Sequence, residues 1–146
     1  MAKKRKHSVN DKTTHRYGVG IIISKKWKDA VLSFVQFSER IILIQTKDNY
    51  NIINIIVQLY APTADKDEEE LEQFYSDLKE VMSATKKQHI NIVMEDLNAK
   101  VEQGKFGEHV GNHGLGSRNE RGDRLVQFCQ NQDLIIASTF YKLPPR

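Results

Sequence analysis

The chain has 146 residues, of which 39% are hydrophobic and 28% charged, and its formal net charge is +3. This size and composition are typical of one soluble globular domain. The single cysteine, Cys129, excludes an internal disulfide and a thiol-rich metal site. No apolar stretch approaches the ~20 residues that cross a membrane, and the opening residues lack the apolar core of a secretory signal. We therefore expect an intracellular protein, nuclear or cytoplasmic, with no membrane partner.

Residues 1–16 form a basic leader that has almost no apolar side chain to bury. Its cations are Lys3, Lys4, Arg5, Lys6, Lys12 and Arg16. Such a cluster is typical of a nuclear-import signal or of an arm that binds nucleic acid, and equally of a solvated leader without a binding role. We expect a disordered segment over residues 1–16 and an ordered domain over residues 17–146.

Four apolar runs open the ordered part and predict strands at residues 17–26, 29–37, 40–46 and 51–62. The third and fourth runs are separated by Lys-Asp-Asn-Tyr-Asn, a series of turn formers, so we expect them to pair as antiparallel strands. The density of isoleucine and valine from Ile52 to Val57 favours strand over helix, and Pro62 ends the run.

The spacing of apolar residues then changes to that of a helix, and the stripe consists of Leu71, Phe74, Tyr75, Leu78, Val81 and Met82. Acidic residues from Asp67 to Glu70 and the pair Lys86 and Lys87 stand at the ends where the helix dipole favours their charges. These features together predict a helix over residues 66–87.

The second half of the chain predicts one more strand–helix–strand unit. Residues 90–94 are expected to form a buried strand, and a glycine-rich loop follows over residues 104–116. Asn119 is suited to cap a second helix with Leu125, Phe128 and Cys129 on its inner face. Residues 133–139 predict a last strand. This order indicates an α/β (α+β) fold, either a mixed sheet with helices on one side or two packed sheets with outer helical layers.

The residues that follow the strand at 90–94 are candidates for chemistry. Asp96 and Asn98 leave the same side of the backbone if the segment stays extended, so they could converge on one small target. A carboxylate can accept a proton from water or hold Mg²⁺, and an amide can orient the water. The alternative is a turn after the strand, which Asp and Asn often make.

Tyr60 also stands at the end of an expected strand, just before Pro62. If that strand neighbours the one at 90–94, Tyr60 and Asp96 would face a common cleft. A phenol there could donate a hydrogen bond to a phosphate oxygen. The alternative is an amphipathic residue at the rim of the sheet.

Three stretches, LYAPT, INIVMEDLNAK and GLGSRNERGDRLVQFCQNQDLI, resemble the endonuclease/exonuclease/phosphatase superfamily. The chain is most similar to the apurinic-type endonuclease domain of non-LTR (LINE-type) retrotransposons, from about Tyr17 to its end. The spacing of Asn119, Gly122 and Leu125 is typical of the retrotransposon branch.

This resemblance implies a four-layer αββα sandwich and Mg²⁺-dependent hydrolysis of phosphodiesters in DNA. It implies that Asp96 activates or positions the attacking water and that Asn98 helps to orient it. Tyr60 would contact the scissile phosphate or stabilise its developing charge. Asn119 would lie in a loop that approaches the nucleic-acid backbone and so contribute to substrate binding.

The chain also departs from the family pattern. Glu95 stands where the family has glycine, and its charge beside Asp96 disfavours an incoming phosphate. Ser138 stands where the family has asparagine. The family's metal-binding glutamate and its Asp–His pair fall outside the matched region, so we expect a sandwich truncated at both ends. The residues that bind metal are unknown.

Two functional hypotheses are consistent with these features. The first is a retrotransposon-derived endonuclease-like fragment that is inactive by itself. The second is a non-catalytic module that binds protein or nucleic acid, including DNA. A sandwich cut in half exposes sheet edges and apolar faces, so self-association through those edges is also expected.

Overall fold

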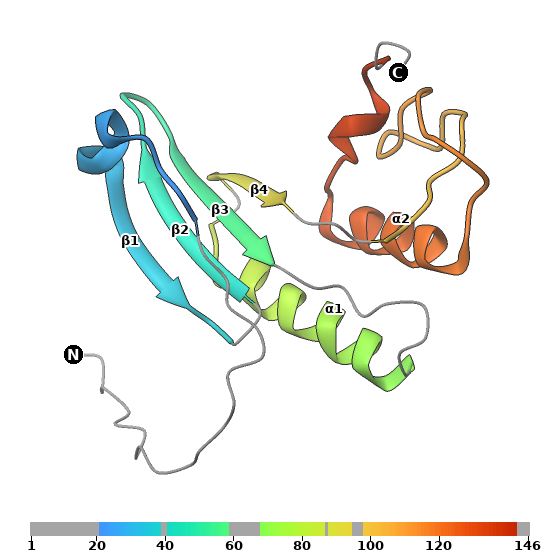
Figure 1. Cartoon of the computed structure of the whole chain (residues 1–146), viewed down its shortest axis with the longest axis horizontal. Helices are drawn as coiled ribbons and strands as arrows, with labels where there is room; N and C mark the ends of the chain where they lie inside the picture. The colour runs from blue at the N-terminus through green and yellow to red at the C-terminus, as the bar shows by residue number, and fades with distance from the viewer. Residues whose placement is uncertain (1–20, 39–40, 59–67, 87, 95–97, 143–146) are drawn as a thin grey trace.

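The computed structural model describes residues 21–38, 41–58, 68–86, 88–94 and 98–142. In chain order they form the 3-10 helix η1 (Lys25–Ala30), the strands β1 (Val31–Gln36), β2 (Ile41–Lys47) and β3 (Ile52–Gln58), the helix α1 (Glu68–Ser83), the strand β4 (Ile90–Met94), the helix α2 (Glu120–Gln132) and the 3-10 helix η2 (Ala137–Thr139). The protein is thus a mixed α/β structure, as the sequence predicts (Figure 1).

The four strands form one sheet in the order β1-β2-β3-β4. The neighbours β1–β2 and β2–β3 are antiparallel, which confirms the predicted hairpin, and β3–β4 is parallel. Because parallel strands need a long connection, the chain crosses from β3 to β4 through α1. At the β2–β3 turn, the backbone N–H groups of Tyr50 and Asn51 donate to the carboxylate of Asp48 and lower its pKa below the usual 3.8.

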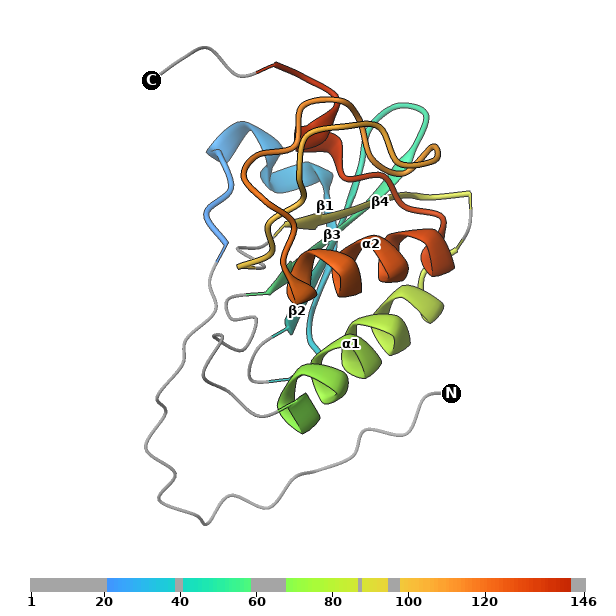
Figure 2. The same ribbon diagram turned by 90° about the vertical axis from the view of Figure 1, so that its right-hand side faces the viewer.

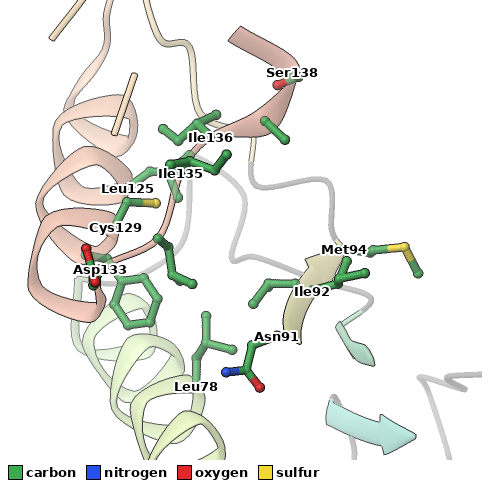
Figure 3. A pocket seen from close by; sticks show the side chains of 14 residues that line it. Leu78, Asn91, Ile92, Met94, Leu125, Cys129, Asp133, Ile135, Ile136 and Ser138 are labelled. Atoms are coloured by element: carbon green, nitrogen blue, oxygen red, sulfur yellow. The ribbon is translucent and has the colours of Figure 1, made fainter. Parts of the chain in front are cut away.

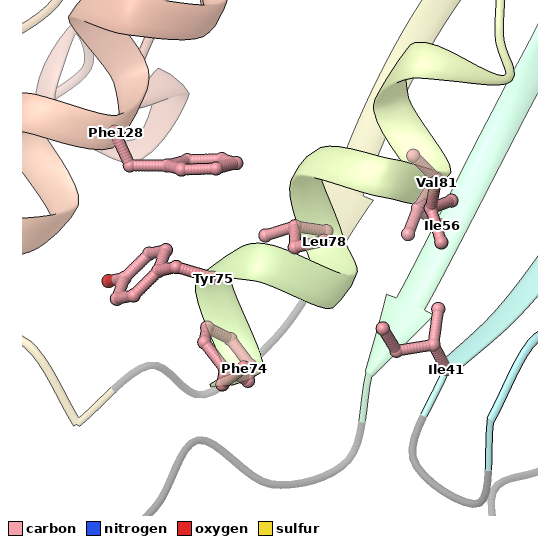
Figure 4. Packing of buried hydrophobic residues seen from close by; sticks show 7 residues of the cluster. All are labelled: Ile41, Ile56, Phe74, Tyr75, Leu78, Val81 and Phe128. Carbon is pink, nitrogen blue, oxygen red and sulfur yellow. The ribbon is translucent and has the colours of Figure 1, made fainter. Parts of the chain in front are cut away.

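Helix α1 covers one face of the sheet, and this contact forms the main core (Figure 4). The core consists of Ile41, Ile56, Phe74, Tyr75, Leu78, Val81 and Phe128. Four of these residues lie on the stripe predicted from helical spacing, so that prediction is confirmed. Helix α2 lies beside α1 (Figure 2), and the ring of its Phe128 lies 5.1 Å from the ring of Tyr75.

A smaller core holds the glycine-rich loop against α2. It consists of Val101, Val110, Leu125, Val126 and Cys129, with Ala99, Leu134 and Ile136 packed at its edge. The predicted inner face of the second helix is therefore confirmed, since Leu125, Phe128 and Cys129 are all buried. Burial raises the pKa of the Cys129 thiol to about 11.

Three predictions about strands are wrong. Residues 21–24 have no regular structure and residues 25–30 form η1, so the strand predicted at 17–26 is absent from the described part of that range. β4 is not buried, because Ile90, Ile92 and Met94 are 45%, 40% and 48% exposed, and among the described strands it lies at the edge of the sheet. Residues 133–139 form no strand; Ile136 makes a single bridge to Val110 and η2 follows.

A row of polar side chains crosses the sheet beneath the helical layer. Asn54 is fully buried and accepts a hydrogen bond from Gln45 at 2.9 Å. Its amide nitrogen lies 2.7 Å from the Asn91 oxygen, to which it donates, and 3.2 Å from Nδ1 of His89. Gln45 in turn accepts from Ser33 at 2.9 Å. This row links all four strands and satisfies the buried amide of Asn54.

Replacing Asn54 with alanine should therefore destabilise the fold by about 2–3 kcal/mol, because the half-buried Gln45, His89 and Asn91 each lose a partner. Urea denaturation measures the loss. The matched control Gln130→Ala changes an exposed amide on α2 and should shift the free energy of unfolding by less than about 0.5 kcal/mol. Equal effects of the two substitutions would contradict a structural role for the row.

Candidate functional site

The carboxyl ends of β3 and β4 lie at the same edge of the sheet. The two strands are parallel neighbours, and Val57 pairs with Met94 near their ends. This confirms the premise that the strands preceding Tyr60 and Asp96 are adjacent. Both residues themselves lie outside the described part of the chain. Their convergence on one cleft therefore stays a prediction.

Asn98 is the first described residue after β4, and its side chain is exposed. Its φ angle is +47°, in the left-handed region that asparagine tolerates better than most residues. An extended path through Asp96-x-Asn98 would have put both side chains on one side of the backbone. The backbone is not extended at Asn98 itself, where the chain turns, but residues 95–97 lie outside the described part of the chain, so the convergence of Asp96 and Asn98 stays a prediction.

Asn119 links this turn to the start of α2. As the N-cap it accepts a hydrogen bond from the backbone N–H of Gly122 at 2.8 Å, as the sequence predicts. The same side-chain oxygen accepts from the N–H of Lys100 at 3.0 Å, and the backbone N–H of Asn119 donates to the Lys100 carbonyl at 3.3 Å. The side-chain nitrogen lies 3.5 Å from the carbonyl oxygen of Asn98.

Gly122 allows α2 to approach the segment at Lys100. A Cβ atom added at Gly122 would collide with the carbonyl oxygen of Lys100. Three residues further on, Leu125 enters the smaller core and is 8% exposed. The spacing of Asn119, Gly122 and Leu125 thus has a structural basis: a cap, a close backbone approach and a core contact. A role for Asn119 in substrate binding stays a prediction.

The arginines near this edge make contacts within the protein. Arg118 lies 3.6 Å from Glu102 and 3.5 Å from Asp123, and its guanidinium is 5.0 Å from the ring centre of Phe106. Arg124 donates two hydrogen bonds of 2.8 Å to Glu72. Arg124 therefore joins α2 to α1.

A polar groove of about 710 Å³ opens between the first turns of α1 and α2. Its lining is Glu68, Leu71, Glu72, Asn119, Glu120, Arg121 and Arg124. Both helices contribute carboxylates and α2 contributes two arginines, so the groove carries charges of both signs. Among the described residues no group of three or more His, Cys, Asp and Glu is placed to hold a metal ion. Within the same residues no helix is long and apolar enough to cross a membrane.

The described residues thus define a mixed α/β protein in which Asn98 and Asn119 lie beyond the carboxyl end of the parallel strand β4. Two curated relatives are similar to this chain, and both are called craniofacial development protein 2. The protein from Bos taurus is 33% identical over 132 residues, which are 90% of this chain and 22% of the relative. The protein from Tragulus javanicus is 33% identical over 132 residues, which are 90% of this chain and 23% of the relative.

The chain is therefore homologous to a segment of craniofacial development protein 2, and it spans less than a quarter of the length of these relatives. This confirms one part of the resemblance, the similarity to craniofacial development protein 2. No protein-family model and no solved structure matches the chain.

Replacing Asn119 with alanine should destabilise the protein by about 1–2 kcal/mol, since the cap and the bond to Lys100 are both lost. Asn119→Asp keeps the acceptor and adds a negative charge at the positive end of the helix dipole, so it should retain most of the stability. Thermal unfolding of the two variants distinguishes them. An aspartate variant as unstable as the alanine variant would contradict the capping role.

Cys129 should be nearly unreactive in the folded protein. Burial raises its pKa from the usual 9.0 to about 11, so near pH 8 it holds about 100-fold less thiolate than an unfolded chain. The stability that this group contributes is complete below pH 9.0 and is lost as the pH rises through about 11. Iodoacetamide labelling followed by mass spectrometry, with and without urea, measures the difference. Similar labelling rates in the two conditions would show that the thiol is accessible.

Proposed function

We propose that this chain is a retrotransposon-derived endonuclease-like domain segment, related to Mg²⁺-dependent phosphodiester hydrolases that act on DNA. The whole domain would be a four-layer αββα sandwich, and the sheet with α1 would supply two of its layers. The proposal rests chiefly on the parallel pairing of β3 and β4. Tyr60 and Asp96 follow these two strands in sequence, and the carboxyl ends of the strands are adjacent.

The capped start of α2 supports the same placement. Asn119 holds the segment from Asn98 to Lys100 against α2, so two stretches that are separate in sequence meet beyond the end of β4. In the proposed site Asp96 would position or activate water and Asn98 would help to orient it. Tyr60 would contact the scissile phosphate, and Asn119 would lie near the nucleic-acid backbone. Mg²⁺, when bound, would neutralise charge on the phosphate and lower the pKa of the attacking water.

The 146-residue chain should not cleave DNA by itself. Glu95 adds a second carboxylate beside Asp96, and like charges at that position repel a phosphate. The glutamate and the Asp–His pair that the resemblance implies are not among the residues that match the family. We therefore propose weak DNA binding at this edge without Asp96-dependent nicking.

A non-catalytic role in binding another protein is the second candidate. The observation that favours it is the exposure of Ile90, Ile92 and Met94 along β4, which is unusual for apolar residues on one strand of a soluble protein. Such a module would bind its partner without any dependence on Asp96 or Tyr60.

The charge at Glu95 provides the test of the first proposal. Glu95→Gln should strengthen binding to a short DNA duplex several-fold at low salt, because it removes a charge that opposes phosphate. The matched control Glu108→Gln removes an exposed carboxylate from the glycine-rich loop and should have a smaller effect. Fluorescence anisotropy measures both affinities.

A plasmid-nicking assay with Mg²⁺ completes the test, with Asp96→Ala as its control. Nicking by the chain that disappears in this variant would overturn the statement that the chain does not cleave alone. If Glu95→Gln and Glu108→Gln changed DNA affinity equally, the proposed phosphate site at this edge would be wrong. Binding of a protein partner that ignores both substitutions would favour the second candidate.

A further inference from the structure

An apolar groove of about 550 Å³ separates β4 from the segment that follows α2. Asn91–Met94 line one side, Asp133–Ser138 line the other, and Leu125, Phe128 and Cys129 of α2 line the groove between them. Figure 3 shows Ile92 and Met94 on one side and Ile135 and Ile136 across from them. In the part of the chain that the structure describes, no strand pairs with the outer edge of β4.

The two walls of the groove have the same alternation of buried and exposed side chains. On β4, Val93 packs against the main core, whereas Ile92 and Met94 are 40% and 48% exposed. On the opposite wall, Leu134 and Ile136 pack against the cores, whereas Ile135 between them is 59% exposed. A period of two is the pattern of a strand with one covered face, and the covered faces of both walls lie on the side of the helices.

The connection also has the form that a parallel strand requires. The chain leaves β4, passes through α2 and returns to the groove at Leu134, and such a crossover is how parallel neighbours are joined. The left-handed Asp133, with φ of 54°, ends α2 and turns the chain, and the N–H of Leu134 donates to the carbonyl of Cys129 at 2.8 Å. The segment is therefore tethered at Leu134, and its apolar residues favour strand. Its closure would also have to release the bond from the N–H of Ile136 to the carbonyl of His109 and unwind η2.

We propose that Leu134–Ser138 is a strap that closes onto β4 as a fifth, parallel strand. Closure pairs the outer edge of β4 and brings Ile135 onto the same face as Ile92 and Met94. The open arrangement leaves that edge available to another strand, so the strap controls whether β4 can self-associate. The occupant of the groove is thus the chain's own segment, which is always present and needs no partner.

Disulfide cross-linking tests the closure in a Cys129→Ala background, in which the chain has no native cysteine. Ile135→Cys is combined in turn with Ile90→Cys, Ile92→Cys and Met94→Cys, since the register of the closed pair is not fixed by the open form. Neighbouring strands put paired residues within disulfide reach. One of the three pairs should lose both free thiols under mild oxidation and keep the mass of a single chain.

The same three positions combined with Ile136→Cys are the matched controls, because Ile136 would face the other side of the closed strand. Lys47→Cys with Ile52→Cys, which are paired across β2 and β3, reports that each background folds and can cross-link. The proposal is overturned if the Lys47→Cys/Ile52→Cys pair forms its disulfide and no pair with Ile135→Cys does. It is also overturned if the Ile135→Cys pairs form disulfides only between two chains. Equal linking of the Ile135 and Ile136 sets also overturns it.

Hydrogen exchange on the unmodified chain gives a second measurement that no substitution can disturb. β1 is the other edge strand, and its outer edge is the internal reference. A strap that closes should make the amides of β4 exchange more slowly than those of β1. Exchange in β4 as fast as in β1, at low protein concentration, contradicts closure.

Discussion

The parallel pairing of β3 with β4 is the constraint on which the rest of this structure depends. Pairing from Ile53–Ile90 to Val57–Met94 forces the chain to cross the sheet once, and α1 is that crossing. The crossing puts the apolar stripe of α1 over Ile41 and Ile56, so the main core is a consequence of the topology. It also brings the carboxyl ends of two strands to one edge, which is where side chains from different stretches of sequence can meet.

The segment from Asn98 to Lys100, just beyond β4, is held by backbone contacts more than by side-chain packing. The oxygen of Asn119 accepts from two N–H groups, one in α2 and one at Lys100, and Gly122 lets the two segments touch. The side-chain amide of Asn119 thus bonds a backbone N–H in the first turn of α2 that has no partner within the helix, and it also holds the segment at Lys100. This explains why the pattern of asparagine, glycine and leucine can persist in a chain irrespective of whether the site cleaves DNA.

The sequence predicts most of the elements because their signals are local. The helical spacing from Leu71 to Val81, the turn formers near Asp48 and the cap at Asn119 are each read from neighbouring residues, and each is found in the structure. Burial of β4 could not be predicted in this way. The run of residues 90–94 is as apolar as a central strand, and only the order of strands shows that it lies at an edge.

The path of the backbone at the candidate site was equally hidden from sequence. The local pattern allowed both an extended strand and a turn at Asn98, and it could not show the contact with Asn119, 21 residues away, that accompanies the non-extended backbone. The polar row through Asn54 was missed for the same reason. Its signal was present as single polar residues among the apolar residues of three strands, Gln45, Asn54 and Asn91, but only the register of the strands makes them neighbours.

The strand predicted at residues 133–139 differs from these cases. Its apolar residues favour a strand, whereas in the structure the segment forms a single bridge followed by η2. Leu134 and Ile136 already pack against the cores, whereas Ile135 between them is exposed. The backbone of the segment has scattered partners, namely the bridge of Ile136 to Val110 and the bond from its N–H to the His109 carbonyl, and the edge of β4 lies across the groove. Among the described residues, Leu134–Ser138 belongs to no strand of the sheet and the outer edge of β4 has no neighbouring strand. A single movement of five residues would give each of them a strand neighbour, and it would also keep the edge away from other chains.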